Sequence, residues 1–144
     1  MKSLSVKVGV VLFIFGLIIL GNIEVWGADW RVYGEPASDI GVYYYDADSI
    51  SSPSKNIVRV WEKVVYSAKG VISHIEELGE LYENLSYTVT LWEVDCVQKK
   101  EQILKTNWYS KDETSLSSTE FQKTSWTFVN PDSMGEALYE VVCK

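Results

Sequence analysis

The sequence has one histidine, His74, and two cysteines, Cys96 and Cys143, among its 144 residues. This scarcity excludes histidine-rich metal sites, zinc sites built from cysteine pairs, and haem attachment motifs. No serine lies in a G-x-S-x-G motif, and no glycine-rich phosphate-binding loop occurs. We therefore expect a protein that is not an enzyme and that needs no cofactor or metal.

Basic side chains are also few. The chain carries 13 basic and 20 acidic residues, a net charge of -7 at pH 7. Nucleic acid is excluded as a partner because phosphates need a basic surface, and a surface attracted to anionic lipid is excluded for the same reason. Hydrophobic residues make up 47% of the chain and aromatic residues 13%, which is typical of a folded domain and not of a disordered one. The length suits a single domain.

The one long apolar run is N-terminal. It extends from Val8 to Ile23 behind Lys2 and Lys7, the pattern of a secretory signal peptide covering residues 1–27 with cleavage near Gly27-Ala28. At roughly 16 residues the run is shorter than the ~20 of a spanning helix, although an uncleaved membrane anchor is the alternative. Cleavage leaves a domain of residues 28–144 with 11 basic and 19 acidic side chains, a net charge of -8. We expect this domain in the periplasm, at the cell surface or outside the cell, and off the membrane.

Export places the two cysteines in an oxidising compartment. Two cysteines allow one intramolecular disulfide, Cys96–Cys143. It closes a loop of about 48 residues, for which chain entropy gives roughly 4 kcal/mol of stabilisation. We therefore expect a structural bond and not a redox-active pair.

The pattern of the remaining chain predicts an α+β fold. We expect a single antiparallel β-sheet of about five to six strands, with a C-terminal helix packed on it and tethered by the disulfide, plus one middle helix. Residues 110–118 are polar and resemble a loop. The expected strands are Trp30–Tyr33, Val42–Tyr45, Ile57–Tyr66, Tyr87–Val97, Gln102–Tyr109 and Phe121–Val129.

The two helices are predicted from caps and apolar spacing. For the middle helix, Ser73 and Glu76 form a capping-box pattern. The C-terminal helix is capped by Asp132 or Ser133. Cys143 lies off its apolar stripe, so the helix must end near Val142 for the sulfur to reach Cys96. That stripe comprises Met134, Ala137, Leu138, Val141 and Val142.

The strand Ile57–Tyr66 provides the candidate site. Alternation places Arg59, Trp61 and Lys63 on one face and the mostly apolar residues, with Glu62, on the other. Aromatic residues beside arginine are favoured in protein interfaces, so we expect Arg59, Trp61 and Lys63 to form a protein-binding face. The alternative is that the cation stems pack over an amphipathic sheet. His74 is expected at the surface.

The ordered landmarks of the chain resemble the bacterial surface-adhesin protein E family. The resemblance covers nearly all of the chain from Trp30 onward and includes both cysteines. It implies an antiparallel sheet with a C-terminal helix held by the disulfide, binding to extracellular-matrix and plasma proteins, and dimerisation. The motifs that carry it are Tyr44-Tyr45-Asp46-Ala47-Asp48-Ser49-Ile50, Val58-Arg59-Val60-Trp61, Leu91-x-Glu93-Val94-Asp95-Cys96, Trp126-x-Phe128-Val129-x-Pro131-Asp132-Ser133, Gly135-Glu136-Ala137-Leu138 and Val142-Cys143.

Three functions follow as hypotheses. The first is an exported, non-catalytic binding module of the bacterial envelope with an unidentified protein ligand. The second is a periplasmic structural or assembly factor. The third is a hydrolytic enzyme, which would require two carboxylates converging in a pocket.

Overall fold

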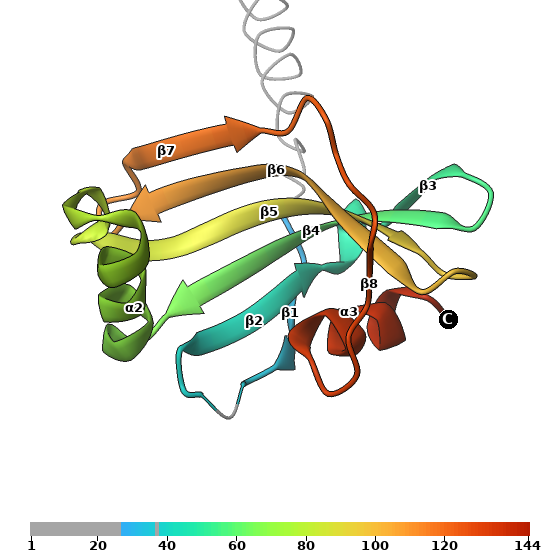
Figure 1. The fold of residues 1–144 in the computed structure, drawn as a ribbon, viewed down its shortest axis with the longest axis horizontal. Helices are drawn as coiled ribbons and strands as arrows, with labels where there is room; N and C mark the ends of the chain where they lie inside the picture. The colour runs from blue at the N-terminus through green and yellow to red at the C-terminus, as the bar shows by residue number, and fades with distance from the viewer. Residues whose placement is uncertain (1–26, 37) are drawn as a thin grey trace, which may run out of the picture.

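The computed structural model describes residues 27–36 and 38–144, which form one antiparallel sheet with two helices (Figure 1). The main path of the sheet has six strands in the order β1-β2-β4-β5-β6-β7. The predicted count of five to six is too low for the whole sheet, which has eight strands, because β3 pairs with β4 and β8 pairs with β6. The strands are β1 (Trp30–Gly34), β2 (Gly41–Asp46), β3 (Ser51–Ser54), β4 (Ile57–Tyr66), β5 (Leu85–Asp95), β6 (Lys100–Ser110), β7 (Ser115–Glu120) and β8 (Thr127–Phe128).

The strands predicted in the first three-quarters of the chain are all present, although β3 was not predicted, and the predictions are wrong near the C-terminal end. The strand Ile57–Tyr66 has the predicted bounds, and the other early strands differ by one or two residues. The polar segment 110–118, expected to be a loop, overlaps the first part of β7, and the expected strand Phe121–Val129 is reduced to β8. The sequence of β7 is serine-rich and half-exposed. Its strand conformation comes from its ladder with β6, because pairing can override weak local propensity.

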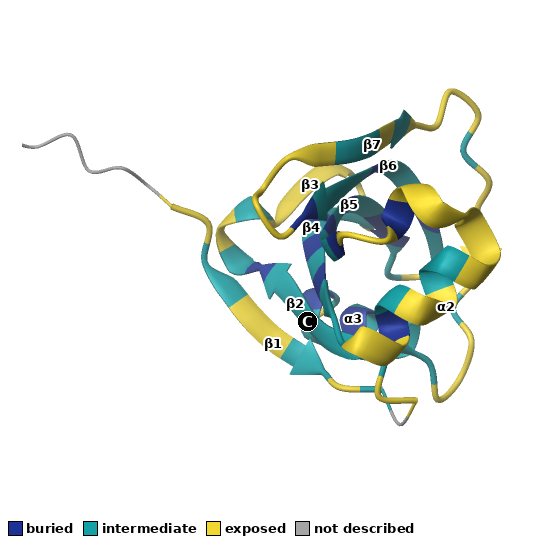
Figure 2. Cartoon of the chain, turned by 90° about the vertical axis from the view of Figure 1, so that its left-hand side faces the viewer, coloured by how far each residue is buried: buried dark blue, intermediate teal, exposed yellow. Residues whose placement is uncertain are grey.

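The alternation predicted for β4 is confirmed. Val60, Glu62 and Val64 are buried and define what we call the inner face of the sheet. Val60 is packed with Val94 of β5 and with Leu138 and Val142 of helix α3 (Met134–Val142) in the main core cluster. Figure 2 shows the sheet curving around α3, with buried positions on this inner side. The opposite side, which carries Arg59, Trp61 and Lys63, is the outer face.

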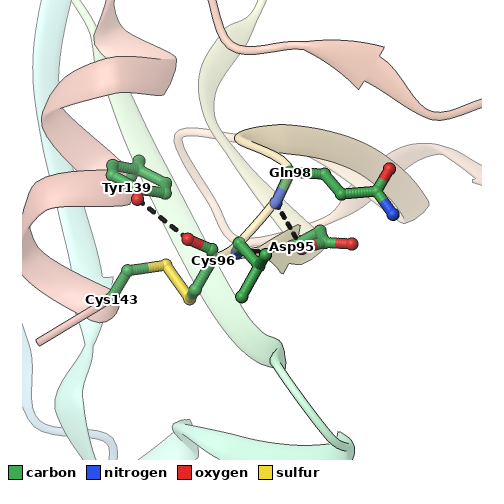
Figure 3. Close-up of a disulfide and its surroundings, with 6 residues drawn as sticks. Asp95, Cys96, Gln98, Tyr139 and Cys143 are labelled. Atoms are coloured by element: carbon green, nitrogen blue, oxygen red, sulfur yellow. Dashed lines mark hydrogen bonds between the residues drawn. A yellow bond between two sulfur atoms is a disulfide. The ribbon is translucent and has the colours of Figure 1, made fainter.

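Helix α3 is fastened to the sheet at its C-terminal end. Ser133 caps its start by accepting a hydrogen bond from the N–H of Glu136 (3.1 Å). The helix ends at Val142, and Cys143 forms the disulfide with Cys96, with Cα atoms 5.5 Å apart (Figure 3). The hydroxyl of Tyr139 donates to the backbone carbonyl of Cys96 at 2.9 Å (Figure 3). The predicted pairing, the apolar stripe and the early helix end are all confirmed.

The middle helix, α2 (Ala68–Leu78), begins earlier than predicted. Its cap is Ser67, whose hydroxyl accepts a hydrogen bond from the N–H of Gly70 at 3.1 Å. Ser73, the predicted cap, lies in the middle of the helix with an exposed side chain. Gly70 is buried in the first turn of the helix. A Cβ at position 70 would lie 2.1 Å from the carbonyl oxygen of Ile40, so glycine is required there by close packing and not by a turn.

The predicted signal segment covers residues 1–27. The signal segment lies outside the described residues except for Gly27. Among residues 27–36 and 38–144, no helix is both long and apolar enough to span a membrane.

Candidate functional site

The predicted binding residues share the outer face of β4. The antiparallel register pairs Arg59 with Glu93 and Trp61 with Leu91 of β5, and it pairs Lys63 with Tyr44 of β2. All three predicted residues are partly exposed. The structure therefore brings together Arg59, Trp61 and Lys63 in the centre of the sheet, where a partner could contact them at the same time.

Arg59 is tied to the sheet by a buried carboxylate. Its guanidinium donates to Oε1 of Glu93 through Nη2 (2.5 Å) and Nε (3.1 Å), and the amide of Gln102 donates to Oε2 of Glu93 at 2.7 Å. The side chain of Arg59 is 39% exposed, whereas that of Glu93 is 12% exposed. Arg59 thus presents one edge to solvent while its charge is balanced from beneath. At Arg59, the structure agrees with the alternative to a binding face, in which the cation packs over the sheet.

Lys63 has a different environment, built from aromatic rings. Its ammonium nitrogen lies 4.4 Å from the ring centre of Tyr87 and 5.8 Å from that of Trp30. Tyr87 stacks on Tyr109 with ring centres 4.9 Å apart. Among the described residues, the ion pairs are Arg31–Asp29 and Arg59–Glu93, so Lys63 is a cation held by rings and without a carboxylate partner there.

We call Trp30, Lys63, Tyr87 and Tyr109 the aromatic-cation cluster. Its three rings come from β1, β5 and β6, and the sequence prediction omitted all of them. Alternation assigns each ring to a face of its own strand, but the register between strands decides which rings meet. The pairing of Tyr87 with Val65 of β4 and with Tyr109 of β6 brings the cluster together.

Trp61 lies between the two cations of β4. Its backbone N–H donates to the hydroxyl of Ser49 at 3.0 Å, and Ser49 in turn donates to the carbonyl oxygen of Asp46 (2.7 Å). Asp46 organises the turn after β2 by accepting from the N–H groups of Asp29 and Asp48. The turn thus holds the backbone at Trp61.

The inner face contains a buried carboxylate, Glu62. Its two oxygens accept hydrogen bonds from the hydroxyl of Tyr33 and from the indole Nε1 of Trp92, the latter at 2.8 Å. Burial raises the pKa of Glu62, against the opposing effect of these two hydrogen bonds. Burial and the neighbouring Glu62 also raise the pKa of Tyr33 well above its usual value. The group is a satisfied part of the interior.

A second carboxylate, Glu101 of β6, lines the same inner cavity as Glu62. This is the carboxylate pair that the enzyme hypothesis requires. Each oxygen of Glu62 already accepts one hydrogen bond from a donor of the protein, Tyr33 or Trp92. His74 also lines this cavity. It is half-buried rather than at the surface, because it packs on Tyr66 and its Nδ1 donates to the carbonyl of Gly70 at 2.9 Å.

No metal centre is found in the part of the chain that the structure describes. Its His, Cys, Asp and Glu residues form no group of three or more that could hold an ion. Both cysteines are in the disulfide. The acidic residues of the middle segment, Glu76, Glu77, Glu80 and Glu83, are all exposed.

These features define a class, a small disulfide-bonded α+β domain built on a single antiparallel sheet whose terminal helix is fastened to the inner face. Within that class, the chain belongs to the surface-adhesin protein E family, whose model matches residues 30–144. The family resemblance predicted from the sequence is therefore confirmed.

Comparison with solved structures agrees on the fold. Protein E from non-typeable Haemophilus influenzae superposes with a TM-score of 0.51 at 13% identity, covering 85% of this chain and 79% of that one. Another Haemophilus influenzae protein E structure gives a TM-score of 0.50, also at 13% identity, and covers 85% of this chain and 88% of that one. A search of curated proteins by sequence gives no match.

Proposed function

We propose that the protein is an exported, non-catalytic binding module of the bacterial cell envelope that attaches to other proteins. The observation that carries this proposal is the match of the surface-adhesin protein E family to residues 30–144. Export requires the predicted signal segment, with cleavage near Gly27-Ala28.

We further propose that the protein ligand contacts the outer face at Arg59, Trp61 and Lys63. Trp61 and the aromatic-cation cluster offer rings and a cation on one partly exposed surface, which is the composition that interface hot spots favour. Lys63 is the residue whose charge is available to an acidic group of a partner, because the charge of Arg59 is balanced by Glu93.

The location is tested first, on intact cells. A surface adhesin is cleaved by protease added from outside, whereas a periplasmic structural or assembly factor is protected until the outer membrane is opened. Protection of the full chain on intact cells would favour the second hypothesis. Edman sequencing of the exported protein reads the cleavage point, for which we expect Ala28 as the first residue.

Binding is tested with purified protein on immobilised extracellular-matrix and plasma proteins, the ligands that the family resemblance implies. The double variant Trp61→Ala/Lys63→Ala should lose binding. A matched control, Trp126→Ala/Lys123→Ala, removes the same residue types from the exposed segment before β8 and should bind as the wild type does. Arg59 is left in place, since its removal would leave the buried Glu93 without its ion-pair partner.

Two results would contradict the site. One is equal binding by the Trp61→Ala/Lys63→Ala variant and the wild type. The other is equal loss in the control variant. Sedimentation of the same samples measures the dimerisation that the resemblance implies, and a dimer that dissociates in the Trp61→Ala/Lys63→Ala variant alone would assign the outer face to self-association.

A further inference from the structure

The inner face of the sheet encloses a second site, on the opposite side from the proposed protein-binding face. A cavity of about 380 Å³ lies between the sheet and helices α2 and α3. Its size falls in the range of small-molecule pockets, roughly 300–1,000 Å³. Its walls come from six elements: β2, β4, β5, β6, α2 and α3.

The walls are aromatic and apolar, with a few hydroxyl groups. Rings of Tyr43, Tyr66, Trp92 and Trp108 contribute to the lining, and Leu78 contributes an aliphatic wall. Several of the hydroxyls already bond to each other. Tyr66 pairs with Thr88 at 3.1 Å, and Thr90 pairs with Thr106 at 3.2 Å across β5 and β6. These pairs leave the body of the cavity suited to an apolar group.

The cavity lining includes two carboxylates, Glu62 and Glu101, and no lysine or arginine. Its other titratable side chains are His74 and the tyrosines. Oε1 and Oε2 of Glu62 are both occupied by donors of the protein. Glu101 differs, since its Oε2 is buried and has no hydrogen-bond partner. A buried carboxylate oxygen without a partner is costly, and burial accordingly raises the pKa of Glu101.

The approach of helix α3 confines Glu101. Gly135 lies in the first turn of α3, and a Cβ at that position would be 2.6 Å from both carboxylate oxygens of Glu101. The carboxylate is therefore held at the wall of the cavity by close contact with the helix. Its Oε2 is closed off from solvent there, so a donor in the cavity reaches this oxygen when the carboxylate turns away from the helix.

We propose that this cavity binds a small organic amine, with its ammonium group at Glu101 and its apolar body against the aromatic walls. The ammonium supplies a hydrogen-bond donor to the unpartnered oxygen of Glu101 and a positive charge that balances the carboxylate. Tyr43 and Trp92 contribute aromatic rings to the lining, and the face of an aromatic ring attracts a cation. An anionic ligand would be repelled by two carboxylates, and a neutral hydrocarbon would leave Oε2 of Glu101 unsatisfied.

The acidity of the domain agrees with a cationic ligand. Its net charge of -8 after removal of the signal segment raises the local concentration of cations over that of anions. The site is independent of the proposed protein-binding face, because Glu62 and Glu101 lie on the inner face, and Arg59, Trp61 and Lys63 lie on the outer face.

The test uses three ligands of similar size on the whole exported domain. The probes are phenethylamine, 2-phenylethanol and 3-phenylpropanoate, titrated by calorimetry at neutral pH. We expect phenethylamine to bind one to one and about tenfold more tightly than the alcohol, as a hydrogen bond to a charged group predicts. The propanoate should not bind.

Variants then locate the site. Glu101→Gln keeps the side-chain shape and should reduce the affinity for phenethylamine to that of the alcohol. Glu140→Gln removes an equal charge from an exposed position on α3 and should leave the affinity unchanged. Leu78→Trp, at a half-exposed wall of the cavity, should weaken the amine and the alcohol alike by filling the space.

Several results would overturn the proposal. They are equal affinities for phenethylamine and 2-phenylethanol in the wild type, equal losses in Glu101→Gln and Glu140→Gln, and absence of saturable amine binding. Indole signals of Trp92 and Trp108 in NMR spectra report on the cavity. Shifts confined to Trp30 and Trp61 would place the amine on the outer face, which also refutes it.

Discussion

Removal of the disulfide offers the sharpest test of how α3 is held. The perturbation is the double variant Cys96→Ala/Cys143→Ala. The bond joins positions 47 residues apart, so the unfolded chain loses the freedom of a loop of about 48 residues. The loop-entropy relation gives about 4 kcal/mol of stabilisation at 25 °C for this loop.

The folded state should survive this change. Leu138 and Val142 remain buried against Val60 and Val94 in the variant's core. The hydrogen bond from Tyr139 to the carbonyl of Cys96 does not need the sulfur atoms. We therefore expect the helix to stay docked, and the loss to arise in the unfolded chain, which becomes more expanded.

Urea unfolding followed by tryptophan fluorescence measures the effect. The expected loss is about 4 kcal/mol in the free energy of unfolding, with an m-value that is unchanged or slightly larger because the unfolded chain exposes more surface. For a domain of roughly 115 residues this corresponds to a decrease in Tm of roughly 15 °C. Reductant should destabilise the wild type to the level of the variant, and it should not affect the variant.

Two outcomes would refute this reasoning. A loss below about 1 kcal/mol would mean that the loop-entropy relation fails for this chain. Rapid amide exchange throughout α3 in the variant would mean that the bond holds the helix in place, and that burial of Leu138 and Val142 is insufficient. Leu138→Ala is the comparison for lost docking, with an expected cost of about 2–5 kcal/mol.

Two further predictions concern α2 and the inner face. Ser67→Ala should cost about 1 kcal/mol in thermal unfolding because it removes the cap of α2, whereas Ser73→Ala, inside the helix, should cost nothing; the reverse order would restore Ser73 as the cap. Burial raises the pKa of Glu62 in the folded state, so the unfolded chain releases this proton first as the pH rises. The wild type should therefore lose stability relative to Glu62→Gln as the pH rises above about 4, the usual pKa of a glutamate in the unfolded chain. Paired urea titrations measure this, and a difference independent of pH would contradict the raised pKa.

Local patterns in the sequence were sufficient for the elements with strong periodicity. The alternation in Ile57–Tyr66 predicts both faces of β4, and the stripe from Met134 to Val142 predicts the buried side of α3. Both segments bury one face, so selection for burial leaves a periodic record in the sequence. Two cysteines made the disulfide a matter of elimination.

Weaker segments failed for identifiable reasons. In β7, hydrogen bonds to β6 compensate for a serine-rich sequence. At the start of α2, the capping pattern of Ser73 and Glu76 indicates the wrong cap, since the helix begins at Ala68 and Gly70 lets its first turn approach the carbonyl of Ile40. In both cases the deciding partner lies outside the segment itself, in the preceding strand β6 for β7 and at Ile40 for α2.

The candidate sites divide in the same way. The sequence by itself determined that Arg59, Trp61 and Lys63 share a face, because strand geometry has a period of two. Tertiary structure alone decided that Glu93 balances Arg59, that Lys63 meets Trp30 and Tyr87, and that Glu101 borders a cavity under α3. These contacts depend on strand register and on helix docking. Both are set by the packing of segments far apart in the chain, which no local pattern records.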